Sequence, residues 1–431
     1  MNLYTVKSGD SLFSISREFG VPAGLIAVWN AISPPYILVV GQCLLILTPE
    51  RLYTAVRGDT YASVAEKNGI TERELFSNNP NLYGGAAILY EGQTLVISFA
   101  EKPSSSIRMN GYAYTYIEPR ILSYSLPYLS YLTPFTYGFR ENGDLVNLDD
   151  EALISAAEDF GVAPLMHLST LTENGTFSSE RASVLFRSPS AMENLANNIV
   201  ATIQRKGYSG LDIDFEFIPS ENAADYAMFI ERLRNLLNPL GYPVIAALAP
   251  KTSAEQSGVL YEGHDYSLIG AAANAVLIMT YEWGYTYGPP MAVAPIPAVR
   301  RVLDYAVSEI SPSKIFMGLP NYAYDWILPY KQGYTRATLI GNDEAVGIAR
   351  RFGAEIKFDE TAKTPYFNYY LNGNTHEVWF EDVRSMREKF ALITEYGFAG
   401  GGYWNMMRKF DQGFLLQNVT FSLDMSPKVI F

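Results

Sequence analysis

From residue 108 onward, short apolar runs rich in β-branched and aromatic residues alternate with longer runs of helical periodicity. Residues 190–207 and 222–241 are representative helical runs, on either side of the fourth apolar run. This alternation is typical of βα units whose strands pair in parallel. Eight strand-like runs lie within about 320 residues, which predicts an α/β fold, a closed (β/α)8 TIM barrel. The predicted strands are 109–116, 131–137, 162–168, 209–216, 243–249, 275–281, 314–319 and 397–404.

The connection between the seventh and eighth predicted strands is too long for a single helix. It contains the segments YKQGYTRATL and TPYFNYYLNGNTHEVWF, which are typical of short strands and turns. We therefore predict a small α+β subdomain inserted at about 322–380, within a barrel domain that extends over 108–431.

The first hundred residues contain an internal repeat. YTVKSGDS at residues 4–11 matches YTAVRGDT at residues 53–60, an offset of 49 residues, and Asn30 matches Asn79 at the same offset. In each copy a short strand leads to a Gly-Asp turn, two short helices and a closing strand. The pattern predicts two small βααβ modules, at 1–49 and 50–98. A Pro- and Ser-containing linker at 99–107 follows them.

These repeats resemble LysM modules over residues 2–48 and 51–98. The resemblance implies binding of polymers that contain N-acetylglucosamine, such as peptidoglycan or chitin, in a groove between the Gly-Asp loop and the loop around the matched asparagine. Two modules without any ligand remain the alternative, since a fold alone does not prove binding. The candidate glycan-binding residues are Gly9, Asp10, Asn30, Gly58, Asp59 and Asn79.

Three acidic residues alternate along the fourth predicted strand. Asp212, Asp214 and Glu216 share one face of the strand, roughly 6–7 Å from one to the next. The opposite, apolar face packs under the helices of a barrel, so the acids line its interior and end at the C-terminal rim, where barrel enzymes place their active sites. Acids stacked in a core are costly unless some are protonated or hydrogen-bonded. General acid catalysis by Glu216 fits this arrangement, and a metal site or a buried polar network is the alternative.

The segment from Ser209 to Glu216 resembles the Asp-x-x-Asp-x-Asp-x-Glu signature of glycoside hydrolase family 18, with Ser209 in place of the first Asp. The resemblance covers residues 108 to about 420. It implies substrate-assisted retention, in which Glu216 is the acid and then the base, while the N-acetyl oxygen of the substrate attacks the anomeric carbon. It also implies that Asp214 orients the acetamido N–H and that Asp212 shares a proton with Asp214.

Further residues match the same family. Met279-Thr280-Tyr281-Glu282 is similar to the family's Met-x-Tyr-Asp, with Glu in the last position, and implies that Tyr281 donates a hydrogen bond to the acetamido oxygen. Trp404 is expected to form the floor under the reacting sugar. Packing in the core is the alternative for Trp404, and also for Tyr112, Asn321 and Tyr322. Trp283 and Trp379 could stack on sugars or fill the core. The expected substrate-binding residues are Trp404, Tyr112, Met279, Glu282, Asn321 and Tyr322.

Composition excludes other classes of function. The formal charge of −13 and the lack of a basic run argue against a nucleic-acid partner. A single cysteine, Cys43, permits no intrachain disulfide, and the three histidines lack the spacing of a metal motif, so we expect neither a metal nor a cofactor. No apolar run approaches the length of a membrane span, and the N-terminus does not resemble a signal peptide. We expect a monomer.

The order of parts, two LysM-like modules followed by this barrel without a signal peptide, resembles the cortex-lytic N-acetylglucosaminidases of endospore-forming bacteria. The resemblance implies cleavage of β-1,4 bonds after N-acetylglucosamine in peptidoglycan, in spore cortex fragments during germination. It also implies synthesis in the mother cell and deposition in the spore coat and cortex region. A chitinase and a non-catalytic glycan-binding coat protein remain the alternatives.

Overall fold

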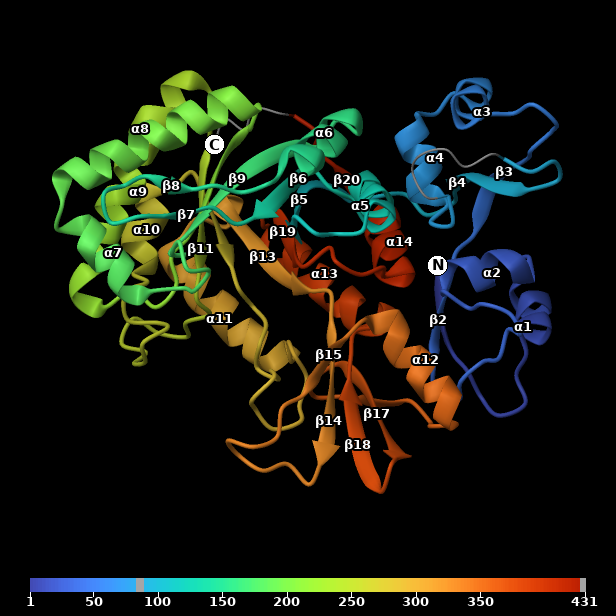
Figure 1. Cartoon of the computed structure of the whole chain (residues 1–431). Helices are drawn as coiled ribbons and strands as arrows, with labels where there is room; N and C mark the ends of the chain where they lie inside the picture. The colour runs from blue at the N-terminus through green and yellow to red at the C-terminus, as the bar shows by residue number, and fades with distance from the viewer. Residues whose placement is uncertain (83–88, 427–431) are drawn as a thin grey trace.

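A computed structural model describes residues 1–82 and 89–426 of the chain (Figure 1). Residues 83–88, within the predicted second module, and 427–431, at the end of the predicted barrel domain, lie outside the described residues. The chain forms two small modules, a barrel and a subdomain that projects from the barrel.

Eight parallel strands in the described part of the chain close into a barrel, because the last strand pairs with the first. Each strand overlaps one of the predicted runs, and the closed barrel confirms the predicted fold class. The barrel strands are β5 (Ser105–Tyr114), β6 (Tyr131–Phe135), β9 (Ala163–Ser169), β10 (Gly210–Asp214), β11 (Val244–Leu248), β12 (Ala275–Ile278), β13 (Ile315–Pro320) and β19 (Gly400–Trp404).

Helices cover the outside of the barrel. In α8 (Pro189–Lys206), Ser188 caps the first turn and Gly207 ends the helix at φ 79°, while the apolar face is buried against the strands. The other helices of this layer are α5 (Pro119–Ser125), α6 (Glu151–Asp159), α7 (Ser179–Phe186), α9 (Ala223–Leu237), α10 (Tyr266–Ala272), α11 (Ile296–Glu309), α13 (Val383–Tyr396) and α14 (Asp411–Thr420).

Short elements complete the barrel domain. Strands β7 (Gly138–Phe139) and β8 (Leu145–Val146) form a hairpin, and β20 (Phe421–Leu423) pairs with the beginning of β5. Four 3₁₀ turns are described: η1 (Leu126–Tyr128), η2 (Ser220–Asn222), η3 (Asn238–Leu240) and η4 (Pro312–Lys314).

An antiparallel sheet with one helix is inserted between β13 and β19, where the sequence predicts a subdomain. Its core combines aliphatic and aromatic side chains, and Trp379 stacks on Tyr366 with ring centroids 4.6 Å apart. Trp379 therefore packs in this subdomain. The elements are β14 (Ala323–Leu328), β15 (Thr338–Ile340), α12 (Asn342–Phe352), β16 (Lys357–Asp359), β17 (Thr364–Leu371) and β18 (Asn374–Trp379).

The two N-terminal modules have the predicted βααβ order. In each, a Ser or Thr caps the first helix and a left-handed Gly ends it. Module 1 contains β1 (Asn2–Thr5), α1 (Leu12–Phe19), α2 (Ala23–Trp29) and β2 (Cys43–Ile46). Module 2 contains β3 (Pro49–Thr54), α3 (Tyr61–Asn68), α4 (Glu72–Asn78) and β4 (Thr94–Phe99).

The connection between module 2 and the barrel is shorter than the predicted linker at 99–107. Strand β4 extends to Phe99, and β5 begins at Ser105 because residues 105–107 pair with β20. A Ser-rich segment satisfies its backbone hydrogen bonds as a strand when a partner strand is available, so composition alone overestimates the linker.

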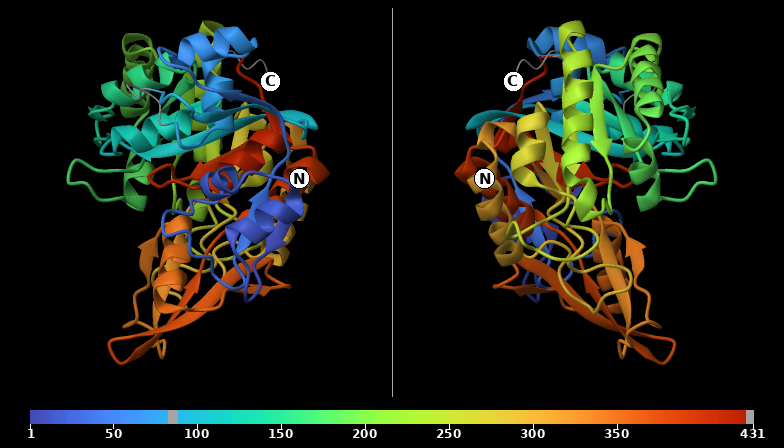
Figure 2. Two further views of the ribbon diagram at one scale, coloured as in Figure 1. Left: turned by 90° about the vertical axis from the view of Figure 1, so that its right-hand side faces the viewer. Right: turned by 90° about the vertical axis from the view of Figure 1, so that its left-hand side faces the viewer.

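Module 2 lies against the barrel domain (Figure 2), and the half-buried side chain of Arg73 joins the two. The Arg73 guanidinium donates hydrogen bonds to the carbonyl oxygens of Pro127 at 3.1 Å and Phe160 at 3.3 Å, and to that of Leu129. Burial lowers the pKa of Arg73 to about 10. This cation is therefore satisfied by three barrel carbonyls and serves as a docking contact.

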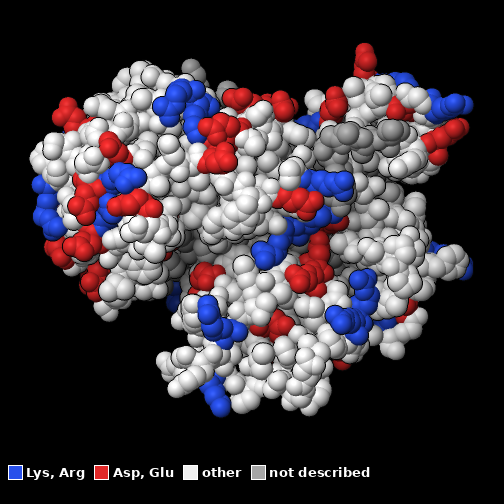
Figure 3. All heavy atoms as spheres, viewed as in Figure 1, with Lys and Arg blue, Asp and Glu red and all other residues white. Residues whose placement is uncertain are grey.

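Module 1 contacts both the barrel and the insertion. The Gln412 side chain on α14 donates to Asn30 Oδ1 and to the carbonyl of Cys43, each at 2.7 Å. The backbone N–H of Ile356 in the insertion donates to the carbonyl of Val40 at 3.0 Å. Both modules are thus joined to the rest of the molecule by hydrogen bonds. On the face seen in Figure 3, basic and acidic side chains are interspersed.

Candidate active site

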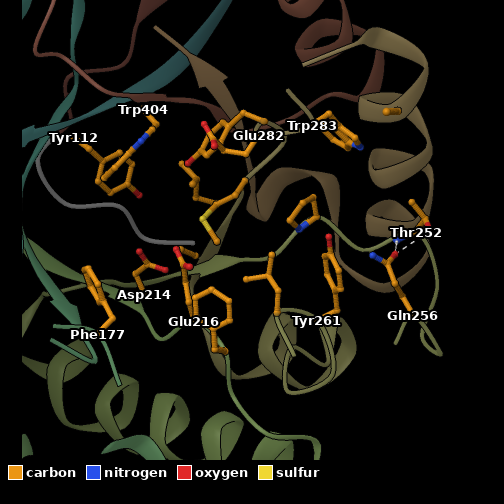
Figure 4. Close-up of a pocket in the computed structure, with 18 of the residues that line it drawn as sticks. Tyr112, Phe177, Asp214, Glu216, Thr252, Gln256, Tyr261, Glu282, Trp283 and Trp404 are labelled. Carbon is orange, nitrogen blue, oxygen red and sulfur yellow. Dashed lines mark hydrogen bonds between the residues drawn. The ribbon is translucent and has the colours of Figure 1, made fainter. Parts of the chain in front are cut away.

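A cavity of about 490 Å³ opens at the C-terminal ends of the barrel strands (Figure 4). Its walls are mainly aromatic, and three carboxyl groups, those of Asp214, Glu216 and Glu282, reach it. Strands β5, β6, β10, β12 and β19 all contribute side chains at or just beyond their ends, as expected of an active site in this fold.

The three alternating acids become more accessible toward the cavity. Asp212 is fully buried, Asp214 is 9% exposed, and Glu216, just beyond the end of β10, is half-buried. The opposite face of the segment is fully buried, as the alternation predicts, and contains Leu211, Ile213 and Phe215. The strand thus presents a row of acids that ends in the cavity.

Asp212 lies deepest in this row. The hydroxyl of Tyr112 on β5 donates to its Oδ2 at 2.6 Å, while its Oδ1 is buried without a hydrogen-bond partner among residues 1–82 and 89–426. Burial raises the pKa of Asp212 to about 7, and the Tyr112 hydrogen bond opposes part of that rise. Asp212 can therefore hold a proton near neutral pH.

Asp214 lies between Asp212 and Glu216. Its Oδ2 is 3.7 Å from Nε2 of His167, and its Oδ1 is buried with no hydrogen-bond partner in the described part of the chain. Burial raises the pKa of Asp214 well above its usual range, and the charges of Glu216 and Asp212 raise it further. Burial also lowers the pKa of His167 to about 3, so the imidazole is neutral and supplies no compensating charge. The acids in this row therefore share protons rather than all ionising.

Packing around the preceding residue fixes the place of Glu216. The Phe215 ring stacks on Phe139 at 5.3 Å and on Tyr226 at 5.5 Å, and its carbonyl lies 2.9 Å from Nε2 of His264. Burial raises the pKa of Glu216, and the charge of Glu282 contributes. A carboxylic acid that stays protonated beside a cavity is suited to general acid catalysis.

Tyr281 and Glu282 follow β12 at the cavity wall. Glu282 has a positive φ of 68° and accepts hydrogen bonds from Tyr322 and, at 3.2 Å, from Tyr324 of the insertion. Partial burial raises the pKa of Glu282, and the two tyrosines oppose that rise. Met279 also lines the cavity. The insertion therefore sets the position and charge of Glu282.

An aromatic floor surrounds Trp404 at the end of β19. Its ring is 5.8 Å from that of Tyr112 and 5.0 Å from that of Phe135, and Tyr114 lies 6.0 Å away. Such a surface suits the apolar face of a sugar ring. The structure thus brings Trp404 together with Tyr112, Met279, Tyr281 and the acids.

A second hollow of about 460 Å³ adjoins this floor. It shares Tyr114, Glu282 and Trp404 with the first cavity and extends between β5 and the insertion. The exposed Tyr116 ring stacks on Tyr114 at its edge, and Tyr322 lines its wall. The cleft therefore continues past Trp404 in this direction.

Asn321 and Ser209 lie outside the cavity. Asn321 is fully buried, and its side-chain amide donates to the carbonyls of Asn405 and Arg408, which positions the loop after Trp404. Ser209 lies at the opposite end of β10, where its N–H donates to Pro164. Asn321 therefore supports the site from behind.

The candidate glycan-binding residues of the modules lie apart from the cavity. None of the residues 1–82 and 89–98 lines it. Gly9 and Gly58 adopt φ of 90° and 92° in the exposed turns. Asp10 accepts from Tyr4 and the Lys7 N–H, and Asp59 accepts from Tyr53, Lys67 and the Val56 N–H. These acids brace the turns that we predicted to bind glycan.

Asn30 and Asn79 are buried inside their modules. Asn30 exchanges hydrogen bonds with the backbone of Leu45, and Asn79 does so with Val96. Because their side chains are fully engaged, glycan contact in this part of each module would fall to neighbouring residues of the loop.

Several residues that line the cavity are not among those predicted from the sequence. Phe135 lies at the end of a predicted strand, so the position of barrel active sites could have identified it. Phe177, Gln256, Tyr261 and Arg301 come from long loops or a helix, where no local pattern distinguishes them. The pairing of Tyr112 with Asp212, which are 100 residues apart, is likewise visible only in the fold.

Within the described ranges, no cluster of three or more His, Cys, Asp or Glu side chains is arranged to hold a metal ion. No helix of residues 1–82 or 89–426 combines the length and apolar character needed to cross a membrane.

Comparison with known proteins identifies both parts of the chain. Residues 112–408 match the family described as Glycosyl hydrolases family 18, and residues 4–46 and 53–98 match the LysM domain.

The similarity extends over almost the whole chain. The cortical fragment-lytic enzyme of Bacillus subtilis is 37% identical over 434 residues, covering 98% of this chain and 99% of the relative. The cortical fragment-lytic enzyme of Bacillus anthracis is 35% identical over 433 residues, covering 97% and 99%. The crystal structure of the Bacillus cereus spore cortex-lytic enzyme SleL has a TM-score of 0.83 at 34% identity, covering 98% of each chain. The chain therefore belongs to glycosyl hydrolases family 18, as a glycoside hydrolase that carries two LysM domains in front of its barrel.

Proposed function

We propose that this protein is a retaining N-acetylglucosaminidase that cleaves peptidoglycan fragments of the bacterial spore cortex. The observation that carries the proposal is the row of acids on β10 that ends in Glu216, in a cavity whose wall includes Trp404 and other aromatic side chains. The near full-length relatives named as cortical fragment-lytic enzymes support the choice of polymer.

Substrate assistance fits the acids on β10. Most retaining glycosidases use a separate carboxylate as the nucleophile. Here Asp214 is almost fully buried, and burial and its acidic neighbours keep its pKa high, which makes it a poor nucleophile. In the proposed reaction an N-acetyl group of the substrate supplies the nucleophilic oxygen instead, and Asp214 accepts a hydrogen bond from the acetamido N–H.

The proposed reaction assigns one role to each group. Glu216 donates its proton to the glycosidic oxygen as the acetamido oxygen attacks the anomeric carbon and the leaving sugar departs. Tyr281 donates a hydrogen bond to that acetamido oxygen, and Asp212, held by Tyr112, shares a proton with Asp214. The Glu216 carboxylate then takes a proton from water, whose oxygen opens the oxazolinium ring with net retention.

The sugar over Trp404 is N-acetylglucosamine in this proposal. Both sugars of peptidoglycan carry an N-acetyl group, but the glucosamine has no lactyl group at O3 and fits a closed aromatic pocket better. In cortex, much of the muramic acid is a lactam, whose nitrogen cannot act as an acetamido nucleophile. The two LysM domains would hold the polymer through their Gly-Asp turns, and two weak sites on one chain gain avidity.

Mass spectrometry of products released from purified spore cortex fragments tests the proposal. Wild type is expected to release muropeptides with N-acetylglucosamine at the reducing end, and Glu216→Gln is expected to be slower by about a thousandfold. Glu221→Gln, an exposed acid in the following turn, is the matched control and should release products normally. Products that end in muramic acid would exclude this bond specificity. Binding without release by wild type would indicate a non-catalytic glycan-binding protein.

A further inference from the structure

The cleft extends beyond Glu216 on the side away from Trp404. Figure 4 shows Trp404 and Tyr112 on one side of Glu216 and a wall that includes Tyr261 and Gln256 on the other. If the reacting sugar lies over Trp404 and Glu216 protonates its glycosidic oxygen, the leaving sugar occupies this second arm. The residues of this wall therefore contact the leaving group.

Arg301 supplies the only basic side chain among the described residues that line the cavity. It lies on α11, one turn after Ala298, which lines the same wall. No carboxylate in the described ranges pairs with its guanidinium, whereas the adjacent Arg300 pairs with Glu395 at 2.5 Å and contacts the Tyr396 ring. Arg301 is therefore a free, solvated cation at the edge of the leaving-group arm.

Gln256 adds a neutral donor to the same wall. Its side-chain oxygen accepts from the N–H of Thr252 at 2.7 Å and from the Thr252 hydroxyl at 3.0 Å. These bonds fix the amide, and its NH₂ group has no partner in the described ranges. An amide donor and a guanidinium that line the same cavity suit a ligand with a carbonyl and a carboxylate, such as an amino acid joined by an amide bond.

We propose that Arg301 binds a carboxylate on the leaving sugar, so that the enzyme selects bonds followed by a muramic acid that carries an amino acid or peptide. This inference rests on the proposed function and names the leaving-group side of its substrate. Chitin offers no carboxylate at this position, and the muramic lactam has none either. Arg301 thus determines specificity, while the acids on β10 carry out the reaction.

The test uses two fragments with identical sugars. Each has N-acetylglucosamine before the cleaved bond. After that bond comes a muramic acid whose lactyl carboxyl group is joined by an amide bond to the amino group of alanine. In one fragment the alanine carboxylate is free, and in the other it is a carboxamide. The ratio of kcat/KM for the free acid over the amide is measured for wild type, Arg301→Gln, Arg301→Lys and Arg300→Gln. We expect a ratio of about ten for wild type and Arg300→Gln, a ratio near one for Arg301→Gln, and an intermediate ratio for Arg301→Lys.

Raising the salt concentration should reduce the ratio for wild type and leave that of Arg301→Gln unchanged. A wild-type ratio near one, or an Arg301→Gln ratio equal to that of wild type, would overturn the inference while the proposed function stands. Failure of wild type to cleave either fragment would overturn the proposed function itself.

Discussion

At the residue scale, the carboxyl group of Asp214 has a strongly raised pKa because of burial and the charges of its acidic neighbours. It is almost fully buried, one of its oxygens has no hydrogen-bond partner among the described residues, and the nearby imidazole of His167 is neutral. A carboxyl group in this position costs stability when it is charged, and such a cost is typical of functional sites.

Replacing Asp214 by Asn is expected to separate stability from activity. Because the folded protein raises the pKa of Asp214, the native state binds a proton more readily than the unfolded chain does. The charged form therefore destabilises the fold above the ordinary aspartate pKa, and this cost disappears as the pH falls below it. Asp214→Asn should thus have a higher Tm than wild type near pH 8 and the same Tm near about pH 3.

The same variant should lose about a hundredfold or more in kcat on cortex fragments, because Asn cannot share the proton with Asp212. Thermal unfolding at both pH values, with turnover at pH 7, checks this expectation. A Tm difference that does not change with pH would contradict the assigned origin of the pKa shift.

Glu282 is expected to set the alkaline limit of activity. Its negative charge raises the pKa of Glu216, which keeps the acid protonated to higher pH. Glu282→Gln removes that charge, so the alkaline limb of the kcat/KM profile should move to lower pH. The profile of Glu221→Gln should match that of wild type, and an unmoved limb in Glu282→Gln would show that the two carboxyls do not interact.

Sequence alone locates the acids at this scale because alternation along one strand is a local property. Asp212, Asp214 and Glu216 must share a face wherever the strand lies. The cation at Arg301 has no comparable signature, since one arginine in an amphipathic helix looks like any other solvated charge. Its importance arises only from what surrounds it in the fold.

At the scale of elements, module 1 approaches the insertion closely at Gly41. A Cβ built at Gly41 would lie 1.8 Å from the carbonyl oxygen of Ile356. The matched residue of module 2, Gly92, has a similar φ, 88° against 82°, but nothing within 4 Å of the same position. Gly92 is therefore a matched control that resembles Gly41 in its backbone φ but lacks the contact.

Gly41→Ala and Gly92→Ala should both lose about 1–2 kcal/mol from the positive φ. Gly41→Ala should lose about a further 2 kcal/mol, because the new methyl group must push the insertion away. Chemical unfolding of both variants measures the difference. Equal losses would mean that the contact between module 1 and the insertion contributes nothing to stability.

The order of elements could be predicted, whereas their ends could not. All eight barrel strands lie where the apolar runs indicate, because strands that are buried on both faces are largely apolar. The linker is shorter than predicted because residues 105–107 pair with β20, which comes from the far end of the chain. Pairing between distant segments leaves no mark in either segment.

At the scale of the whole molecule, a few buried polar contacts join the modules to the barrel. Arg73 is the clearest, since three carbonyl oxygens of the barrel domain depend on it. Loss of this side chain leaves those carbonyls without their partner at a partly buried boundary.

Arg73→Ala is expected to destabilise the chain by about 3 kcal/mol and to let module 2 separate before the barrel unfolds. Wild type should unfold in one calorimetric transition, and the variant should show an earlier second one. Arg57→Ala, an exposed arginine of the same module, is the control and should behave like wild type. Two transitions in wild type would show that the module is already independent.

The docking of both modules fixes the distance between each module and the active-site cleft. Because module 1 is bonded to α14 and to the insertion, and module 2 to the barrel through Arg73, neither can swing on a tether. A module that binds a glycan strand cannot carry it into the cleft. The bound segment and the cleaved bond would therefore be a fixed distance apart. The bonds that the enzyme can cleave would then depend on the spacing between neighbouring glycan strands of its polymer.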